Sequence, residues 1–167
     1  MNIQQTIEMA DACRDGDLEK VKELVELGLD INEVLDEGKT AICWSASHGH
    51  LKLTKYLIEN GANVNFQEED EGESVLTFVM EELDNEDMVS MIELLLDNGA
   101  DVELPDFLGY TPLINATSIG SAPAVEVLLK YGADPHFSLK DPDKASSAME
   151  ICENPSIKEL LEQKNKT

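Results

Sequence analysis

The chain has 167 residues, of which 42% are hydrophobic and 5% aromatic, and this composition predicts one globular unit with a core of small aliphatic side chains. Its formal net charge of −23 at pH 7 argues against direct binding to nucleic acid or to an anionic membrane. No apolar run approaches the roughly 18 residues of a membrane span, and the first residues lack the basic-then-apolar order of a signal peptide. We therefore expect a cytoplasmic protein.

The three cysteines favour packing roles over chemistry. Cys13, Cys43 and Cys152 are odd in number, widely spaced and set among residues of helical pattern. Reduced, buried thiols explain such an arrangement better than a disulfide or a metal site. We expect neither a metal nor another cofactor.

Glycines that end helices recur at a fixed period along the chain. Each of Gly28, Gly61, Gly99 and Gly132 precedes a short extended segment, and their spacings are 33, 38 and 33 residues. A period near 33 residues is typical of a repeat architecture. A second marker precedes three of these units: a turn glycine, one residue, and then a hydroxyl residue that can open a helix, at Thr40, Ser74 and Thr111.

These signals together resemble the ankyrin repeat. The order G-x-T-P-L, G-H and L-L-x-x-G-A-D-x-x is similar to that family over nearly the whole chain. The resemblance implies an all-α solenoid of about five helix-turn-helix repeats with short β-turn fingers, in one domain covering residues 1–167. We place the repeats at residues 2–34, 35–67, 68–104, 105–138 and 139–163, the first and last being degenerate caps.

Individual repeats carry further expectations. Ile3, Ile7 and Ala10 mark the apolar face of the first helix, and the resemblance implies that Thr40 caps the helix that follows it. The third repeat has about five extra residues. We place one near Glu68 in the turn and four in the inter-helix loop at residues 84–87, since insertions in repeat arrays go to loops.

Charge is distributed unevenly along the repeats. Between Lys55 and Lys130 there is no lysine or arginine, whereas aspartate and glutamate number 17, so this stretch supplies −17 of the −23 net charge. One interpretation is a surface that only keeps the protein soluble. The other is a docking face whose field attracts a basic partner.

The fourth repeat has apolar residues where a turn is normally polar. Phe107 and Leu108 lie in its turn, with Tyr110 two residues later. Exposed apolar residues beside a charged rim are typical of a partner-binding patch. Packing of these rings against the adjacent turns is an alternative, more so for Phe107 than for Tyr110.

The resemblance also suggests where a partner binds, because ankyrin-repeat proteins commonly use the concave face formed by turn tips and first helices. Trp44, Phe78 and Asn115 occupy the same repeat position and should form one column, although Trp44 could instead belong to the core. The candidate partner-binding residues are Asp36, Glu37, Trp44, His48, Asp70, Glu71, Glu73, Phe78, Glu81, Glu82, Phe107, Leu108, Tyr110, Asn115 and Ile119.

Catalysis has little support in the sequence. His48 and His50 flank a turn glycine, a spacing better explained by the inter-helix turn of the repeat than by a metal pair. No nucleophile elbow, phosphate-binding loop, Cys-x-x-Cys or calcium-loop pattern is present. We therefore expect a protein that is not an enzyme.

Two functional hypotheses remain. The first is a stoichiometric binder or inhibitor, monomeric when free, that blocks a strongly basic protein with carboxylates in the place of nucleic-acid phosphates. The second is a passive scaffold or adaptor that bridges two larger proteins. An enzymatic role ranks third.

Overall fold

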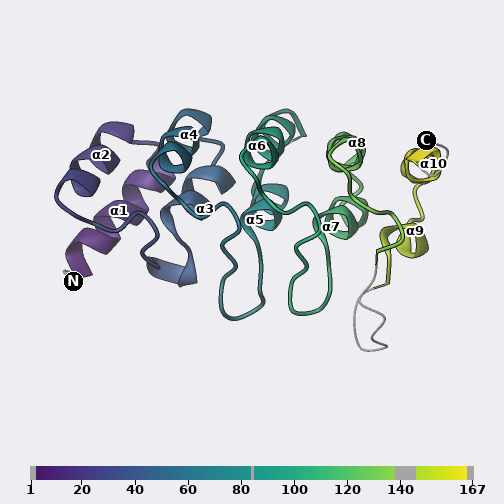
Figure 1. Cartoon of the computed structure of the whole chain (residues 1–167), viewed down its shortest axis with the longest axis horizontal. Helices are drawn as coiled ribbons and strands as arrows, with labels where there is room; N and C mark the ends of the chain where they lie inside the picture. Colours follow the sequence, from purple (N-terminus) through teal and green to yellow (C-terminus); the bar gives the residue numbers. More distant parts are fainter. Residues whose placement is uncertain (1–2, 84, 138–145, 165–167) are drawn as a thin grey trace.

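The computed structural model describes residues 3–83, 85–137 and 146–164. Five helix pairs follow one another along the long axis, and α2, α4, α6, α8 and α10 form one row while α1, α3, α5, α7 and α9 form the other (Figure 1). The bounds are α1 Ile3–Asp15, α2 Leu18–Glu26, α3 Ala41–Ser47, α4 Leu51–Glu59, α5 Val75–Glu82, α6 Asn85–Asp97, α7 Pro112–Ser118, α8 Ala122–Lys130, α9 Ala148–Ile151 and α10 Pro155–Lys164.

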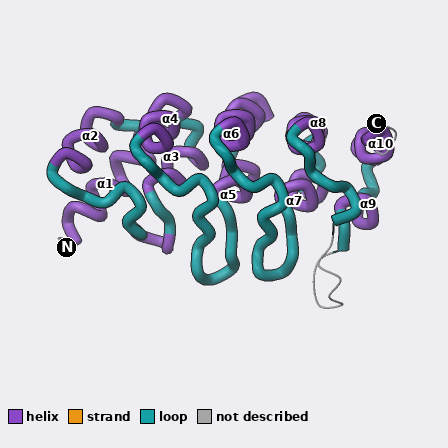
Figure 2. Tube along the Cα trace, in the orientation of Figure 1, coloured by secondary structure: helices purple, strands orange, loops and turns teal. Residues whose placement is uncertain are grey.

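Long loops project from the same side of successive helix pairs (Figure 2). We call three of them finger 1 (residues 32–40), finger 2 (residues 66–74) and finger 3 (residues 104–111). Finger 1 contains a short 3₁₀ turn at Asp36–Gly38, and an isolated antiparallel bridge joins Gln67 to Ser74 in finger 2. Within the described ranges the fingers form no β-structure beyond this single bridge, so the regular structure of the array is all-helical.

Hydroxyl residues stand at the helix starts that the sequence predicts. The side chains of Ser74 and Thr111 accept the backbone N–H groups of the third residue after them, which satisfies one of the unpaired donors of the first turn. Thr40 occupies the corresponding N-cap position of α3, but it makes no such bond. Its Oγ1 instead lies 3.4 Å from the Sγ of Cys43, so the predicted capping bond is missing in this repeat.

Asparagines tie the first repeat to the second and the second to the third. The Nδ2 of Asn32 donates to the Gly61 carbonyl at 3.0 Å, and its Oδ1 accepts the N–H of Asn63 at 2.7 Å. Asn65 makes the equivalent bonds one repeat later: its Nδ2 donates to the Gly99 carbonyl at 3.0 Å, and its Oδ1 accepts the N–H of Asp101 at 2.7 Å. These paired bonds fix the stacking of neighbouring repeats through backbone groups that the turns would otherwise leave unpaired.

The third repeat accommodates the four residues predicted for its inter-helix loop differently from the prediction. The inter-helix loop is not enlarged; α6 has 13 residues, whereas α4 and α8 have nine each. Glu86 and Asp87 lie in the first turn of α6, where the helix dipole favours negative charge, which explains why these residues extend the helix. Asp84, also part of the predicted insertion, lies outside the described residues, as do residues 139–145 of the predicted last repeat.

The apolar face predicted for the first helix is only partly correct. Ala10 is buried, but Ile3 is 78% exposed and Ile7 45% exposed, and Met9 and Cys13 fill the core instead. The 13-residue α1 packs beside α3, which has seven residues. The first turns of α1 therefore extend beyond the helix that covers the rest of it.

Candidate functional site

The candidate partner-binding residues lie in the fingers and on the helices of the α1–α9 row. Those of the fingers are Asp36, Glu37, Asp70, Glu71, Glu73, Phe107, Leu108 and Tyr110; those of α3, α5 and α7 or their C-terminal caps are Trp44, His48, Phe78, Glu81, Glu82, Asn115 and Ile119. We call the surface that these residues share the finger face.

Cations of the chain itself cover the aromatic rings at the start of the finger face. Trp44 is 5% exposed and Phe78 is 2% exposed. The guanidinium carbon of Arg14 lies 3.9 Å from the centroid of the Trp44 ring, and the Lys39 Nζ lies 4.7 Å from that centroid and 4.5 Å from that of Phe78. The two rings therefore offer little surface of their own, and the third position of the column holds the half-buried Asn115.

The acidic residues of finger 1 are paired within the chain. Arg14 forms an ion pair with Asp36 and lies 4.0 Å from Glu37, while the Lys39 Nζ lies 3.9 Å from Glu37. Such exposed pairs add little stability. Their consequence is electrostatic, because they neutralise the carboxylates that this end of the finger face would present to a partner.

Finger 2 is organised by a carboxylate that the sequence did not single out as functional. Glu68 is 7% exposed, and its carboxylate accepts the N–H groups of Asp70 at 2.6 Å and Glu73 at 3.1 Å, and also that of Glu71. Burial raises the pKa of Glu68, but these backbone bonds outweigh burial, so the pKa lies below its usual value. The charge of Glu68 thus holds the turn closed.

Fingers 2 and 3 are joined to each other. The Gln67 Nε2 donates to the Gly72 carbonyl at 2.6 Å and to the Pro105 carbonyl at 2.9 Å, and the N–H of Phe107 donates to the Glu71 carbonyl at 2.9 Å. Gly72 has φ +76°, and a Cβ there would lie 2.5 Å from the Phe107 ring. Phe107 therefore packs against the neighbouring finger, as in the packing alternative, while 52% of it remains exposed.

Negative charge remains uncompensated in the middle of the finger face. The carboxyl group of Glu73 lies within hydrogen-bonding reach of that of Glu81. Burial and then repulsion from Glu81 raise the pKa of Glu73 to about 7. Among the described residues, no lysine, arginine or histidine forms an ion pair with Asp70, Glu71, Glu73, Glu81 or Glu82.

Apolar surface lies beside these acids. Leu108 is 60% exposed at the tip of finger 3, and Ile119 is 51% exposed at the end of α7, whereas Tyr110 is half-buried. Ile119 borders a groove of about 470 Å³ between the third and fourth helix pairs, whose lining includes Met80, Glu81, Leu83, Met88, Gly120 and Ser121.

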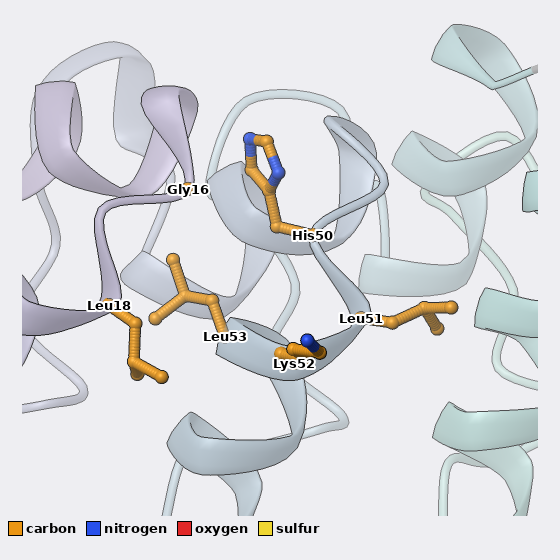
Figure 3. A pocket seen from close by; sticks show the side chains of 6 residues that line it. All are labelled: Gly16, Leu18, His50, Leu51, Lys52 and Leu53. Atoms are coloured by element: carbon orange, nitrogen blue, oxygen red, sulfur yellow. The ribbon is translucent and has the colours of Figure 1, made fainter.

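The histidines serve the architecture of the first two repeats. The His50 Nε2 lies 2.6 Å from the Arg14 carbonyl, and a nitrogen of His48 lies 3.0 Å from the Trp44 carbonyl. Figure 3 shows His50 directed from the start of α4 toward the turn at Gly16, beside a hollow of about 320 Å³ that Leu18 and Leu53 also line. The part of the chain that the structure describes contains no group of three or more histidine, cysteine, aspartate or glutamate residues suited to a metal ion.

The three cysteines are buried and unpaired. Burial raises the pKa of Cys13 to about 12 and also raises that of Cys43. Since the thiolate is the nucleophile and the metal ligand, neither of these two thiols is activated for chemistry. None of the described helices has the length and apolar character needed to cross a membrane.

Sequence comparisons agree with this architecture. The family described as "Ankyrin repeats (3 copies)" matches residues 9–106, and "Ankyrin repeat" matches residues 108–140. The chain is 30% identical over 123 residues to "Ankyrin repeat, SAM and basic leucine zipper domain-containing protein 1" of Dasypus novemcinctus, which aligns 74% of this chain with 26% of that protein. It is also 30% identical over 154 residues to "Probable 26S proteasome regulatory subunit p28" of Saccharomyces cerevisiae, which aligns 90% of this chain with 64% of that protein.

The chain thus spans less than two thirds of the length of either relative. The family matches cover most of the chain and include every helix from α2 to α8 and the second half of α1. The stacked helix pairs, the projecting fingers and these matches lead to one conclusion: the chain belongs to the ankyrin-repeat family of protein-interaction modules.

Proposed function

We propose that this ankyrin-repeat protein is a stoichiometric, non-enzymatic binder that inhibits a basic protein by covering its cationic surface with the finger face. The observation that carries the proposal is the uncompensated negative charge of finger 2 and of α5. The stretch between Lys55 and Lys130 contains no cation, and its acids on the finger face make no ion pair with the described residues. Such a field accelerates encounter with a cationic partner and disfavours an anionic one.

The shape of the charged region supports the same proposal. The Glu68 network and the Gln67 bridge hold fingers 2 and 3 in a fixed arrangement before any partner arrives. A preorganised surface loses less conformational freedom on binding, which favours affinity. One relative is named as a regulatory subunit, and its name is compatible with a chain that acts by binding another protein.

The binding region is narrower in this proposal than the sequence alone suggested. Arg14 and Lys39 already occupy the faces of Trp44 and Phe78 and pair with the acids of finger 1. The contacts of a basic partner therefore centre on the acids of finger 2 and α5 and on the exposed apolar residues of finger 3 and α7.

Affinity capture with charge-matched variants tests this function. The tagged chain is incubated with lysate at about 50 mM and about 300 mM salt, ionic strengths between which screening changes strongly. Captured proteins are then identified by mass spectrometry. We expect basic proteins, recovered mainly at low salt, and loss of recovery for Glu71→Lys combined with Glu82→Lys. The control combines Glu59→Lys with Glu126→Lys on the other row of helices, which changes the net charge equally.

Each reversal on the finger face should cost about 1 kcal/mol, so the double variant should bind roughly 30-fold more weakly. Equal loss in the two double variants, or capture of only acidic or neutral proteins with no salt dependence, would contradict the proposal. Inhibition is checked by adding the chain to the captured protein in equimolar amount and measuring that protein's own activity. An unchanged activity, with two proteins captured at once, would favour the scaffold alternative.

A further inference from the structure

We propose that the basic partner enters the finger face with an aliphatic side chain in the groove at Ile119 and an adjacent lysine or arginine between the carboxyl groups of Glu73 and Glu81. This inference rests on the proposed function and specifies the chemistry of the partner segment. It also assigns the groove between the third and fourth repeats as the principal contact.

The groove has the size and lining to take an aliphatic side chain. Its volume is about 470 Å³, and Met80, Leu83, Met88 and Ile119 supply apolar walls. Ile119 is 51% exposed, so it has apolar surface left for a partner to cover. Methionine side chains are flexible enough to adapt to different aliphatic occupants.

Glu81 connects the groove to the charged site. It lines the groove, and its carboxyl group lies within hydrogen-bonding reach of that of Glu73. An apolar hollow with a carboxyl pair on its rim is complementary to an aliphatic side chain that has a cation close to it. An acidic or purely apolar segment would leave the two carboxylates without a counter-charge.

The neighbouring elements do not supply that counter-charge. In finger 2, Glu68 and Glu71 add repulsion to the carboxyl pair. In finger 1, Lys39 contacts α5 through the Phe78 ring and pairs with Glu37.

Helices α3, α6 and α7 also pack against α5, and finger 3 is bonded to finger 2. Helix α6 adds only acids, and α7 has no charged residue. At the end of α3, the ring of His48 lies 3.0 Å from the Trp44 carbonyl and stacks near His50. In finger 3, the residue corresponding to Glu73 is the neutral Tyr110. The cation that completes the pair therefore comes from the partner.

Binding of that cation should release a proton. Burial and the Glu81 charge raise the pKa of Glu73 to about 7, so at pH 7 a fraction of the free molecules carries a protonated carboxyl group there. A cation between the two carboxyl groups favours their ionised forms. Each complex should then release a fraction of a proton at pH 7, and less at pH 8.

A random dodecapeptide display library panned on the full chain tests the inference. We expect enriched peptides to carry Leu, Ile, Val or Met within two positions of Lys or Arg. The strongest peptide is then synthesised and its binding measured by calorimetry at pH 7 in phosphate and in Tris, whose ionisation enthalpies differ, so that proton release is counted directly.

Two pairs of variants isolate the contacts. Ile119→Ser should weaken binding about tenfold, whereas Leu27→Ser, which alters an even more exposed aliphatic residue at the end of α2, should leave it unchanged. Glu73→Gln should abolish proton release, whereas Glu126→Gln on α8 should preserve it. Circular dichroism and thermal melting confirm that each variant remains folded.

The outcomes separate this inference from the proposed function. Enrichment of basic peptides without an aliphatic neighbour, bound equally by Ile119→Ser and Leu27→Ser, would overturn the groove assignment and leave the proposed function standing. Binding of aliphatic-basic peptides without proton release would overturn the placement of the cation between Glu73 and Glu81. Enrichment of no basic peptide at all would contradict the proposed function itself.

Discussion

Replacing Glu103 with asparagine should stabilise the protein, because asparagine occupies the same place in the two preceding repeats. Asn32 and Asn65 each accept one backbone N–H and donate their Nδ2 to a glycine carbonyl of the next repeat at 3.0 Å. Glu103 accepts the N–H of Asp134 with one oxygen, but its other oxygen is buried without a hydrogen-bond partner among the described residues. A carboxylate cannot donate the second bond.

The size of the effect follows from these contacts. The variant gains one hydrogen bond, worth about 0.5–1.5 kcal/mol, and removes a buried unsatisfied oxygen, which costs about 1–3 kcal/mol. Because Glu103 is half-buried, we take the low end and expect stabilisation of about 1.5 kcal/mol at pH 7. In a domain of this size, that corresponds to a rise in Tm of roughly 3–6 °C.

The effect should depend on pH. Burial raises the pKa of Glu103; the Asp134 N–H opposes this effect, and repulsion from Asp134 and Asp101 adds to it, for a net upward shift. Because the pKa of Glu103 is higher in the folded state, the stability that its protonated carboxyl group contributes is fully present below the pKa of the unfolded state. This stability is lost as pH rises through the pKa of the folded state. The advantage of asparagine should therefore be largest at neutral pH and shrink toward pH 4.

Urea denaturation followed by circular dichroism and by the fluorescence of Trp44 measures the difference at pH 7 and pH 4.5. The control is Asp101→Asn, which removes the same charge two residues away and retains the oxygen that accepts the Glu103 N–H. The reasoning is refuted if Glu103→Asn is no more stable than this control at pH 7, or if its advantage grows in acid.

The remaining predictions concern the finger 2 turn, the first inter-helix turn and the carboxyl pair. Glu68→Gln should lower the free energy of unfolding by about 2 kcal/mol, because it weakens the hydrogen bonds to backbone N–H groups. The control Glu69→Gln changes an exposed neighbouring residue and should leave the free energy of unfolding unchanged. Equal urea midpoints of the two variants would contradict this prediction. Gly16→Ala and Gly28→Ala both place alanine at positive φ, but only at Gly16 would the new Cβ lie 2.6 Å from an imidazole ring. Gly16→Ala should therefore lower the free energy of unfolding by about 1–3 kcal/mol more than Gly28→Ala. Equal melting temperatures of the two variants would count against the clash. Glu73→Gln should raise the Tm at pH 8 and leave it unchanged at pH 4.5. The reason is that the folded-state pKa of Glu73, about 7, lies above its ordinary value of 4.5, so ionisation of this carboxyl group at high pH destabilises the wild-type fold. A Tm difference that is the same at both pH values would argue against a raised pKa.

Local signals were sufficient to predict most of the fold. The glycine period, the hydroxyl residues Ser74 and Thr111 at helix starts, and the apolar stripes all act within a few residues of one another. The inter-helix loop predicted for four of the extra residues of the third repeat was wrong, because the general preference of insertions for loops was outweighed by the helix dipole, which favours Glu86 and Asp87 in a first turn.

The candidate site could be predicted only in outline. The sequence places Trp44 at a position typical of a binding residue, but it does not indicate that Arg14, 30 residues earlier, lies over its ring. Likewise, Glu68 and Glu69 are indistinguishable as neighbours in an acidic run, although one is buried in a network of N–H groups and the other is exposed. Such differences depend on turn geometry and on contacts between repeats.

By itself, the sequence determined the ankyrin-repeat architecture and the acidic character of the middle repeats, because period and net charge are properties of the chain that folding does not change. Only the tertiary structure decided which acids of the finger face are neutralised: those of finger 1 meet Arg14 and Lys39, whereas Glu73 and Glu81 meet each other. The physical reason is that Coulomb and hydrogen-bond energies depend on distances of a few ångströms, and stacking of the repeats sets these distances between residues far apart in the sequence.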